Sequence, residues 1–353
     1  MSVVIGWDIG GAHLKAARAE AGRVIEAIQV ASPLRFGLDR LAQSFADAKA
    51  AIGPAPRHVV TMTGELADTF VSRAEGVERL SRLAACELAQ GSVLLYAGRA
   101  GFIAPDQAKN HVEDIASANW HASAALVGRR LSAALFLDMG STTTDIVPVV
   151  GATIAARGYT DAERLSAGEL VYTGLVRGFV MATAERAPFA GQWTTLIKEN
   201  FANMADVHRI LGTLPDGADQ MTTADGRDKT VAASQARLAR MVGRDIHDAD
   251  NAAWALLARW FAEAQIRAVT DGALLVLSRA GLPADAPVVG AGIGGAVLRE
   301  VARRLGRQHI AFETLLDVAP EARERASHCA PAAALAVLTS LPTFGVECGQ
   351  WSQ

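Results

Sequence analysis

The chain has 353 residues, of which half are hydrophobic and a fifth are charged, so it is long enough for two domains and too apolar to be disordered. Its net charge of −3 provides no basic surface for nucleic acid or anionic membranes, and we expect neither as a partner. The cysteines Cys86, Cys329 and Cys348 form no CxxC pair, and without a signal-peptide pattern or a membrane-length apolar run we expect a soluble cytoplasmic protein.

The pattern of apolar residues predicts strands and helices in two successive halves of the chain. In the first half we expect strands at 3–7, 14–18, 23–30, 58–62 and 93–96, and helices at 38–52, 80–88 and 115–130. In the second half we expect strands at 131–137, 145–150, 153–157, 287–289 and 309–313, and helices at 229–242, 251–277, 296–305 and 330–339. The less regular stretch 185–250, with its proline and Asp-Gly turns, is predicted to be an insertion that shapes a substrate pocket.

A buried strand that ends in an aspartate and a glycine turn occurs twice. The first copy is Asp8 with Gly10, Gly11, Ala12 and His13, and the second is Asp138 with Gly140, Ser141, Thr142 and Thr143. Glycines let backbone N–H groups approach a phosphate, and the hydroxyl run of the second copy adds donors. An aspartate repels phosphate but can hold Mg²⁺ that bridges to it. We therefore predict two phosphate loops with Asp8 and Asp138 as metal ligands, against the alternative of two ordinary hairpins.

A third glycine-rich motif, Gly290–Gly295, lies between a predicted strand and a predicted helix. It matches G-x-G-x-x-G, and Glu313 follows Gly295 near the spacing of a dinucleotide-binding fold, so an NAD enzyme is an alternative. The motif lies near the end of the chain, only one βα unit follows it, and an NAD site leaves the two aspartate turns unexplained. We therefore interpret it as part of the same phosphate site.

Asp8, Asp138 and the 290–295 loop, in this order, resemble the two phosphate loops and the adenosine loop of the sugar kinase, heat-shock and actin superfamily. The resemblance implies an α/β fold with two ribonuclease-H-like (actin-like ATPase) lobes, at residues 1–130 and 131–353, a ligand cleft between them and a helical insertion at about 185–250. It also implies phosphate contacts from Gly292, Gly294 and Gly295.

Individual stretches of the sequence narrow this resemblance to one branch of the superfamily. The stretches VVIGWDIGGAHLKAA, YAGRAGF, DIASANWHASA, LFLDMGSTTTDIVPV, YTGLVRG and TADGRDKTV resemble the hydantoinase/oxoprolinase-like branch, and within it the tetrahydromethanopterin-linked one-carbon-transfer proteins of methylotrophs and methanogens. The archaeal members are synthases of methanofuran biosynthesis. They join an aminomethylfuran-methyl diphosphate to the phenol of γ-glutamyltyramine and release diphosphate.

The resemblance implies the same transferase reaction here, for methanofuran or methylofuran, with a tyramine- or tyrosine-derived phenolic amine as acceptor. It implies Mg²⁺ as cofactor and leaves ATP open as an alternative ligand. The competing functions are an ATP-dependent kinase or amidohydrolase of the same fold, and a non-catalytic nucleotide-binding protein. The oligomeric state stays open, with a homodimer among the states considered.

Such a reaction needs a base, because an ordinary tyrosine hydroxyl has a pKa of about 10. Lys15, Lys229 and Glu65 are the candidates, and Lys15 is preferred as a catalytic residue because it follows the first loop. Alternatively, each of these three side chains is an ordinary charged group exposed to solvent.

Other residues are candidates for the substrate pocket. Arg99, between two glycines, could hold a phosphate or carboxylate, and Asn119 with Trp120 could line a furan pocket. Lys229 is a third pocket candidate. The His111, Glu113, Asp114 and His121 cluster lacks the spacing of a zinc site, and we expect no metal there.

Overall fold

The first half of the chain forms a six-stranded sheet in the computed structural model, which describes residues 3–340. The strand order is β3-β2-β1-β4-β5-β6, in which β1 to β3 form an antiparallel meander and β4 and β5 run parallel to β1. The strands are β1 (Val3–Ile9), β2 (His13–Glu20), β3 (Arg23–Ala31), β4 (Arg57–Met62), β5 (Ser92–Tyr96) and β6 (Phe102–Ile103). The helices are α1 (Leu38–Ile52), α2 (Arg73–Glu87), α3 (Val112–Ile115) and α4 (Asn119–Arg130).

The second sheet repeats the topology of the first. Its order is β10-β8-β7-β13-β14, with β9 also paired to β8; β7 and β8 form an antiparallel hairpin, and β13 and β14 run parallel to β7. The strands are β7 (Ala133–Met139), β8 (Thr144–Val150), β9 (Thr153–Ile154), β10 (Leu170–Val171), β13 (Val288–Gly292) and β14 (His309–Ala311). The two sheets confirm the predicted ribonuclease-H-like lobes, and they place the ends of β1 and β7 at equivalent positions.

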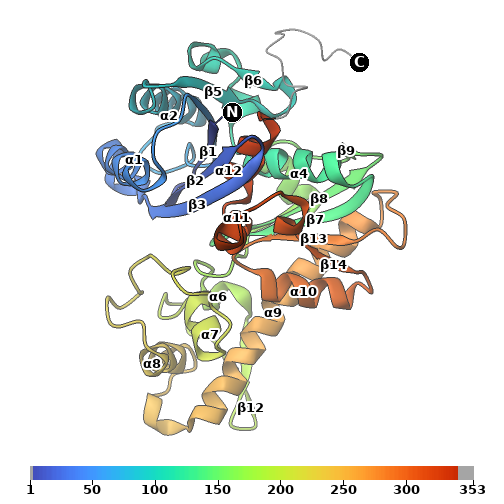
Figure 1. Ribbon diagram of the computed structural model, residues 1–353. Coiled ribbons are helices and arrows are strands. Elements are labelled where there is room, and N and C mark those ends of the chain that lie inside the picture. Colours follow the sequence, from blue (N-terminus) through green and yellow to red (C-terminus); the bar gives the residue numbers. More distant parts are fainter. Residues whose placement is uncertain (1–2, 341–353) are drawn as a thin grey trace.

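Two helices pack between the sheets and hold the lobes together (Figure 1). Helix α12 (Ala330–Leu338), although it comes from the end of the described chain, packs on β1 and β2, while α4 packs on β7, β8 and α12. At Gly6, a Cβ would collide with the backbone of Ala332, so only glycine allows this close approach. The remaining helices of the second lobe are α5 (Asp161–Ala167), α10 (Gly295–Arg304) and α11 (Arg323–His328).

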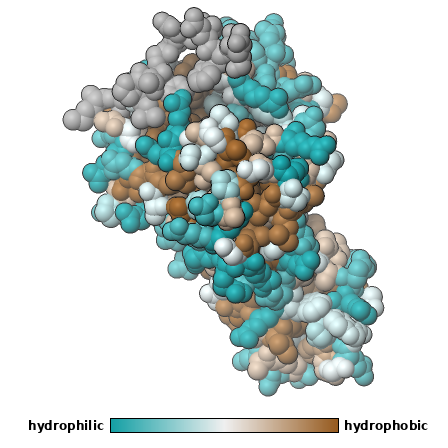
Figure 2. Space-filling model, turned by 90° about the vertical axis from the view of Figure 1, so that its right-hand side faces the viewer, coloured by the Kyte–Doolittle hydropathy of each residue, from teal (hydrophilic) through white to brown (hydrophobic). Residues whose placement is uncertain are grey.

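An inserted region extends away from the second lobe. It contains α6 (Val180–Thr183), the hairpin β11 (Arg186–Phe189) and β12 (Gln192–Thr195), α7 (Met204–Ile210) and α8 (Val231–Met241). These pack against α9 (Asn251–Leu277), whose 27 residues span about 40 Å and connect the insertion to the second sheet. Figure 2 shows the same arrangement from the side, as a larger upper body that narrows toward its lower end.

The structure departs from the predicted elements at several places. The predicted helix 115–130 is interrupted, because Ser117 has a φ of 52° and α4 begins only at Asn119. The insertion contains a β-hairpin that the sequence pattern did not reveal, and α11 was also missed. Cys348 lies outside the described residues. Within residues 3–340, no helix has the length and apolar character needed to cross a membrane.

We expect Gly6→Ala to lower the free energy of unfolding by at least about 2 kcal/mol, because the added methyl group would push α12 away from β1. Denaturant titration of the purified variant measures this. Gly11→Ala is the matched control, since a Cβ there has no atom within 4 Å. Equal losses in the two variants would contradict close packing at Gly6.

Candidate functional site

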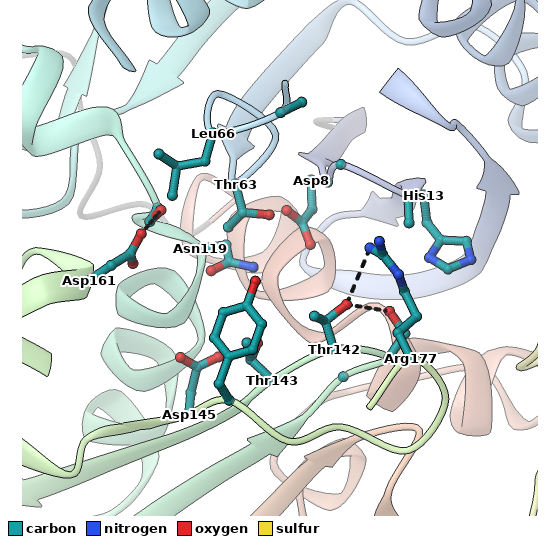
Figure 3. A pocket seen from close by; sticks show the side chains of 18 of the residues that line it. Asp8, His13, Thr63, Leu66, Asn119, Thr142, Thr143, Asp145, Asp161 and Arg177 are labelled. Atoms are coloured by element: carbon teal, nitrogen blue, oxygen red, sulfur yellow. Dashed lines mark hydrogen bonds between the residues drawn. The ribbon is translucent and has the colours of Figure 1, made fainter. Parts of the chain in front are cut away.

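The two aspartate turns meet in one cavity between the lobes. The cavity has a volume of about 590 Å³, and both Asp8 and Asp138 line it. Eight predicted phosphate-loop residues, four from each lobe, share this lining: Gly10, Gly11, Ala12, His13, Gly140, Ser141, Thr142 and Thr143. In Figure 3, His13 and Arg177 lie on one side of the cavity and Asp145 and Asp161 on the other, with Asp8 and Asn119 between them.

The two turns have the same backbone geometry. The amide of Gly10 donates to the carbonyl of His13 at 2.9 Å, and the amide of Gly140 donates to that of Thr143 at 3.0 Å. Across the hairpins, Asp8 pairs in register with Lys15, and Asp138 pairs with Asp145. The equivalent position therefore carries a cation in one lobe and an anion in the other.

Burial dominates the electrostatics of the two turn aspartates. It raises the pKa of Asp8, although the nearby Lys15 and Asn119 oppose this. It raises the pKa of Asp138 to about 7, and the neighbouring Asp145 and Asp8 add to the effect against the opposing charge of Lys15. Asp138 is therefore partly protonated at neutral pH in the ligand-free protein.

Lys15 lines the cavity and faces several acidic groups. Burial alone would lower its pKa, but the attraction of Asp8 and of other acidic neighbours, including Asp138 and Asp145, outweighs burial and raises it. A protonated ammonium cannot accept a proton. The acidic surroundings therefore keep Lys15 protonated. They disfavour the role of catalytic base, for which the sequence analysis preferred this residue.

Asp145 is buried next to a countercharge. Its Oδ1 accepts from Nη1 of Arg164 at 2.8 Å, and the guanidinium of Arg164 lies 4.1 Å from the ring centroid of Trp120. Burial raises the pKa of Asp145, and Arg164 opposes the rise. Trp120 thus belongs to the packed layer behind the site, and it does not line the cavity.

A following segment supports the hydroxyl run from behind. The amide of Leu175 donates to the carbonyl of Gly140 at 3.0 Å, and the amides of Val176 and Arg177 donate to that of Ser141. Gly174 permits this contact, because a Cβ there would collide with the backbone of Thr142. The guanidinium of Arg177 then lies 3.5 Å from the hydroxyl of Thr142, inside the cavity.

Ser117 and Asp161 complete the wall near Asn119. Ser117 donates to Glu65 at 2.8 Å and to Asp161 at 3.1 Å, and these bonds hold its left-handed backbone. Asp161 also accepts from Arg73 of the first lobe at 2.7 Å, so this contact joins the lobes at the rim of the site. Glu65 is buried beneath Ser117 and does not line the cavity.

His13 faces the cavity in its neutral form. Burial lowers its pKa to about 4, and the cations Lys15 and Arg177 add to the effect. Its Nε2 has no hydrogen-bond partner among the described residues. His13 can therefore exchange a hydrogen bond with a ligand without carrying charge.

Several predicted site residues lie elsewhere. Gly292 and Gly294 pack against Asp138 and Met139, where a Cβ would collide, and with Gly295 they are absent from the lining of the cavity. Arg99 lies outside the cavity, 4.1 Å over the ring of Tyr159. Lys229 lies outside it as well, and its ammonium donates to the carbonyl of Asp219 at 2.7 Å. In the structure, Gly292 and Gly294 serve close packing, the guanidinium of Arg99 lies over an aromatic ring, and Lys229 bonds to a backbone carbonyl.

The cavity residues that sequence reasoning missed include Asp145, Asp161, Tyr172 and Arg177. Asp145 ends the second motif, and Arg177 lies in the YTGLVRG stretch. Both residues therefore belong to stretches that carry the family resemblance. Nothing in the sequence indicated that Asp161 would reach the site, because α5 arrives there only through the inter-lobe contacts.

The donor set of the cavity suits a hard divalent cation. Oδ1 of Asp8 is buried and has no hydrogen-bond partner in the described part of the chain, and Asp138 and the hydroxyl run add further oxygens nearby. Among residues 3–340, no group of three His, Cys, Asp or Glu side chains could hold a metal. This fits Mg²⁺, which binds through one or two carboxylates and completes its shell with water and substrate phosphates.

Comparison with known proteins gives consistent results. A family model described as hydantoinase/oxoprolinase matches residues 57–338. A protein of Methanocaldococcus jannaschii, named (4-{4-[2-(gamma-L-glutamylamino)ethyl]phenoxymethyl}furan-2-yl)methanamine synthase, is 30% identical over 251 residues, which cover 69% of this chain and 72% of that protein. A protein of the same name from Methanococcus vannielii is 32% identical over 113 residues, which cover 32% of this chain and 50% of that protein.

Among solved structures, a nucleotide-free acetone carboxylase has a TM-score of 0.51 at 12% identity, covering 94% of this chain and 70% of that one. At this identity the likeness shows a common fold.

The raised pKa of Asp138 predicts a stability effect with a definite sign. In the unfolded chain the pKa of Asp138 is near 4, and in the folded protein it is about 7. Ionisation of Asp138 therefore costs the folded state stability as the pH rises from about 4 through 7. Asn stays neutral over this range. We therefore expect Asp138→Asn to raise the free energy of unfolding by about 2 kcal/mol at pH 8 in metal-free buffer, and by much less at pH 5. Denaturant titrations at both pH values measure the difference; a variant no more stable than the parent at pH 8 would contradict it.

Proposed function

The chain belongs to the hydantoinase/oxoprolinase family, and we propose that it is a synthase that joins an aminomethylfuran-methyl diphosphate to a tyramine- or tyrosine-derived phenol with release of diphosphate. This reaction would serve the biosynthesis of methanofuran or methylofuran for tetrahydromethanopterin-linked one-carbon metabolism. The observation that carries the proposal is the single cavity in which both acidic turns and the hydroxyl run meet. The names of the two archaeal relatives support it, since they describe a phenol joined through an oxymethylene group to a furan.

The residues of the cavity suit a diphosphate leaving group. The hydroxyls of Ser141, Thr142 and Thr143 can donate to its oxygens, and the cations Lys15 and Arg177 can stabilise the negative charge that builds on it. Asp8 and Asp138 would hold Mg²⁺, which supplies further neutralisation of the diphosphate when bound. Their buried carboxylates give the site its preference for a cation over a second anion.

The phenol must lose its proton as the ether bond forms. Of the other carboxylates that line the cavity, Asp161 has Oδ2 occupied by Arg73 and Ser117, whereas Asp145 is bound by Arg164 through Oδ1. We assign the proton acceptor to Asp145, because burial raises its pKa and so makes it a stronger base than an ordinary aspartate. Lys15 keeps an electrostatic role.

An ATP-dependent kinase or amidohydrolase of the same fold is the alternative. The packing of Gly292 and Gly294 against Asp138 and Met139 accounts for these two glycines without a bound nucleotide, so the glycine-rich loop does not by itself favour a nucleotide-dependent enzyme.

We expect purified protein with Mg²⁺, the furan diphosphate and γ-glutamyltyramine or tyrosine to form the aryl ether and release diphosphate without ATP. Mass spectrometry detects the ether, and a pyrophosphate assay gives the rate. Omitting the phenol is the control for simple hydrolysis. An absolute requirement for ATP would contradict the synthase and favour the alternative.

We expect Asp8→Asn and Asp138→Asn each to lower kcat by about 100-fold or more, because each removes an acidic ligand from the diphosphate site. Steady-state kinetics of the ether-forming reaction measures this. Asp39→Asn, an exposed aspartate in the first turn of α1, is the matched control and should keep the parent rate. Full activity in Asp138→Asn would remove that residue from the metal role.

A further inference from the structure

A second cavity, of about 550 Å³, opens from the first between the second lobe and the insertion. Five residues line both cavities and so form their junction: Arg35, Thr142, Tyr172, Arg177 and Met221. This volume lies within the range of pockets that bind small molecules. The insertion therefore adds a compartment that is continuous with the diphosphate site.

The chemistry of the second cavity differs from that of the first. No aspartate, glutamate, lysine or histidine lines it within residues 3–340, and its two arginines both lie at the junction. Away from the junction its walls include Val171, Phe179, Ala182 and Ala268. Phe179 is 45% exposed, so its side chain is accessible to a ligand. These walls suit an aromatic ring better than a phosphate.

One side of the second cavity is a fixed surface of α9. Ala264, Gln265 and Ala268 lie there, and the small alanines leave the space open. Nε2 of Gln265 donates to the carbonyl of Gly174 at 2.8 Å and to the hydroxyl of Thr173 at 3.0 Å. Its Oε1 pairs with Nε2 of His208 at 2.8 Å. These bonds tie α9 to the segment that supports the hydroxyl run, so the two cavities hold a fixed relation.

We propose that the second cavity binds the phenolic acceptor, with its ring against Phe179 and α9 and its hydroxyl at the junction beside Thr142 and Arg177. This inference rests on the proposed function. Displacement at a carbon requires the nucleophile and the leaving group on opposite sides of that carbon. A diphosphate among the acidic and hydroxyl groups of the first cavity places the reacting methylene at the junction, and the acceptor then approaches from the second cavity.

In this step the phenol oxygen forms a bond to the methylene carbon as the carbon–oxygen bond to diphosphate breaks. The diphosphate departs with the electron pair, and the phenol proton passes through water to the carboxylate of Asp145, which lines the first cavity and not the junction. The step therefore needs no oxidant, reductant or nucleotide.

The test is to fill the second cavity without touching the first. Ala268→Leu places a larger side chain in it, on an exposed position of a helix where leucine is well tolerated. Ala252→Leu, an exposed alanine near the start of the same helix and outside both cavities, is the matched control. Equilibrium binding of γ-glutamyltyramine, of tyrosine and of pyrophosphate with Mg²⁺ is measured by calorimetry for both variants and the parent, beside the turnover assay.

We expect Ala268→Leu to weaken binding of the phenol about tenfold or more, to raise its KM to match, and to leave pyrophosphate affinity within about twofold. Phe179→Ala, which removes an aromatic side chain from the wall of the cavity, should also weaken binding of the phenol. Unchanged phenol binding in both variants, or a loss of pyrophosphate binding instead, would overturn the inference whatever the turnover assay shows. If the parent binds the phenol and Ala268→Leu does not, yet no ether forms, the acceptor site stands and the proposed function fails.

Discussion

The full burial of Asp8 and Asp138 and the partial burial of Asp145, close to Lys15 and Arg164, govern the site, because this burial raises the pKa of all three carboxyl groups. Burying an unpaired carboxylate is costly, and a protein that cannot pair it raises its pKa instead. The rigid ends of β1 and β7 hold the aspartates in place, so the cost cannot be relieved by movement of the chain. A bound cation with its anionic ligand relieves it, which explains why so unfavourable an arrangement suits a binding site.

The two lobes repeat the same hairpin, yet they differ at the residue opposite the turn aspartate. Lys15 faces Asp8, whereas Asp145 faces Asp138 and takes its countercharge from Arg164 on another element. A symmetric cavity would treat both ends of a ligand alike. This difference places a lysine near the first loop and an arginine–aspartate pair on the other wall, so the two sides of the cavity differ in charge.

The fold and the two turns could be predicted from the sequence because the signals are local. A buried strand, an aspartate and a glycine turn act within ten or so residues, and the Asp8 and Asp138 motifs carry all of these. The raised pKa of Lys15 was only partly visible in the sequence, because its main cause, Asp8, is local, whereas the contributions of Asp138 and Asp145 come from the other lobe. Ser117 was missed for the same reason: its left-handed backbone is held by Glu65 and Asp161, which are far away in the sequence.

The glycine string at 290–295 shows how one sequence pattern can have two physical causes. At Gly11 and Gly140 the backbone faces the cavity and a Cβ would meet no close neighbour, so these turns leave room for a ligand. At Gly292 and Gly294 the absence of a Cβ lets β13 and the start of α10 pack against Met139 beneath that cavity. The string still contributes to the site, because it fixes the strand that carries Asp138. The glycines of the two turns therefore contact the cavity, whereas Gly292 and Gly294 position its wall.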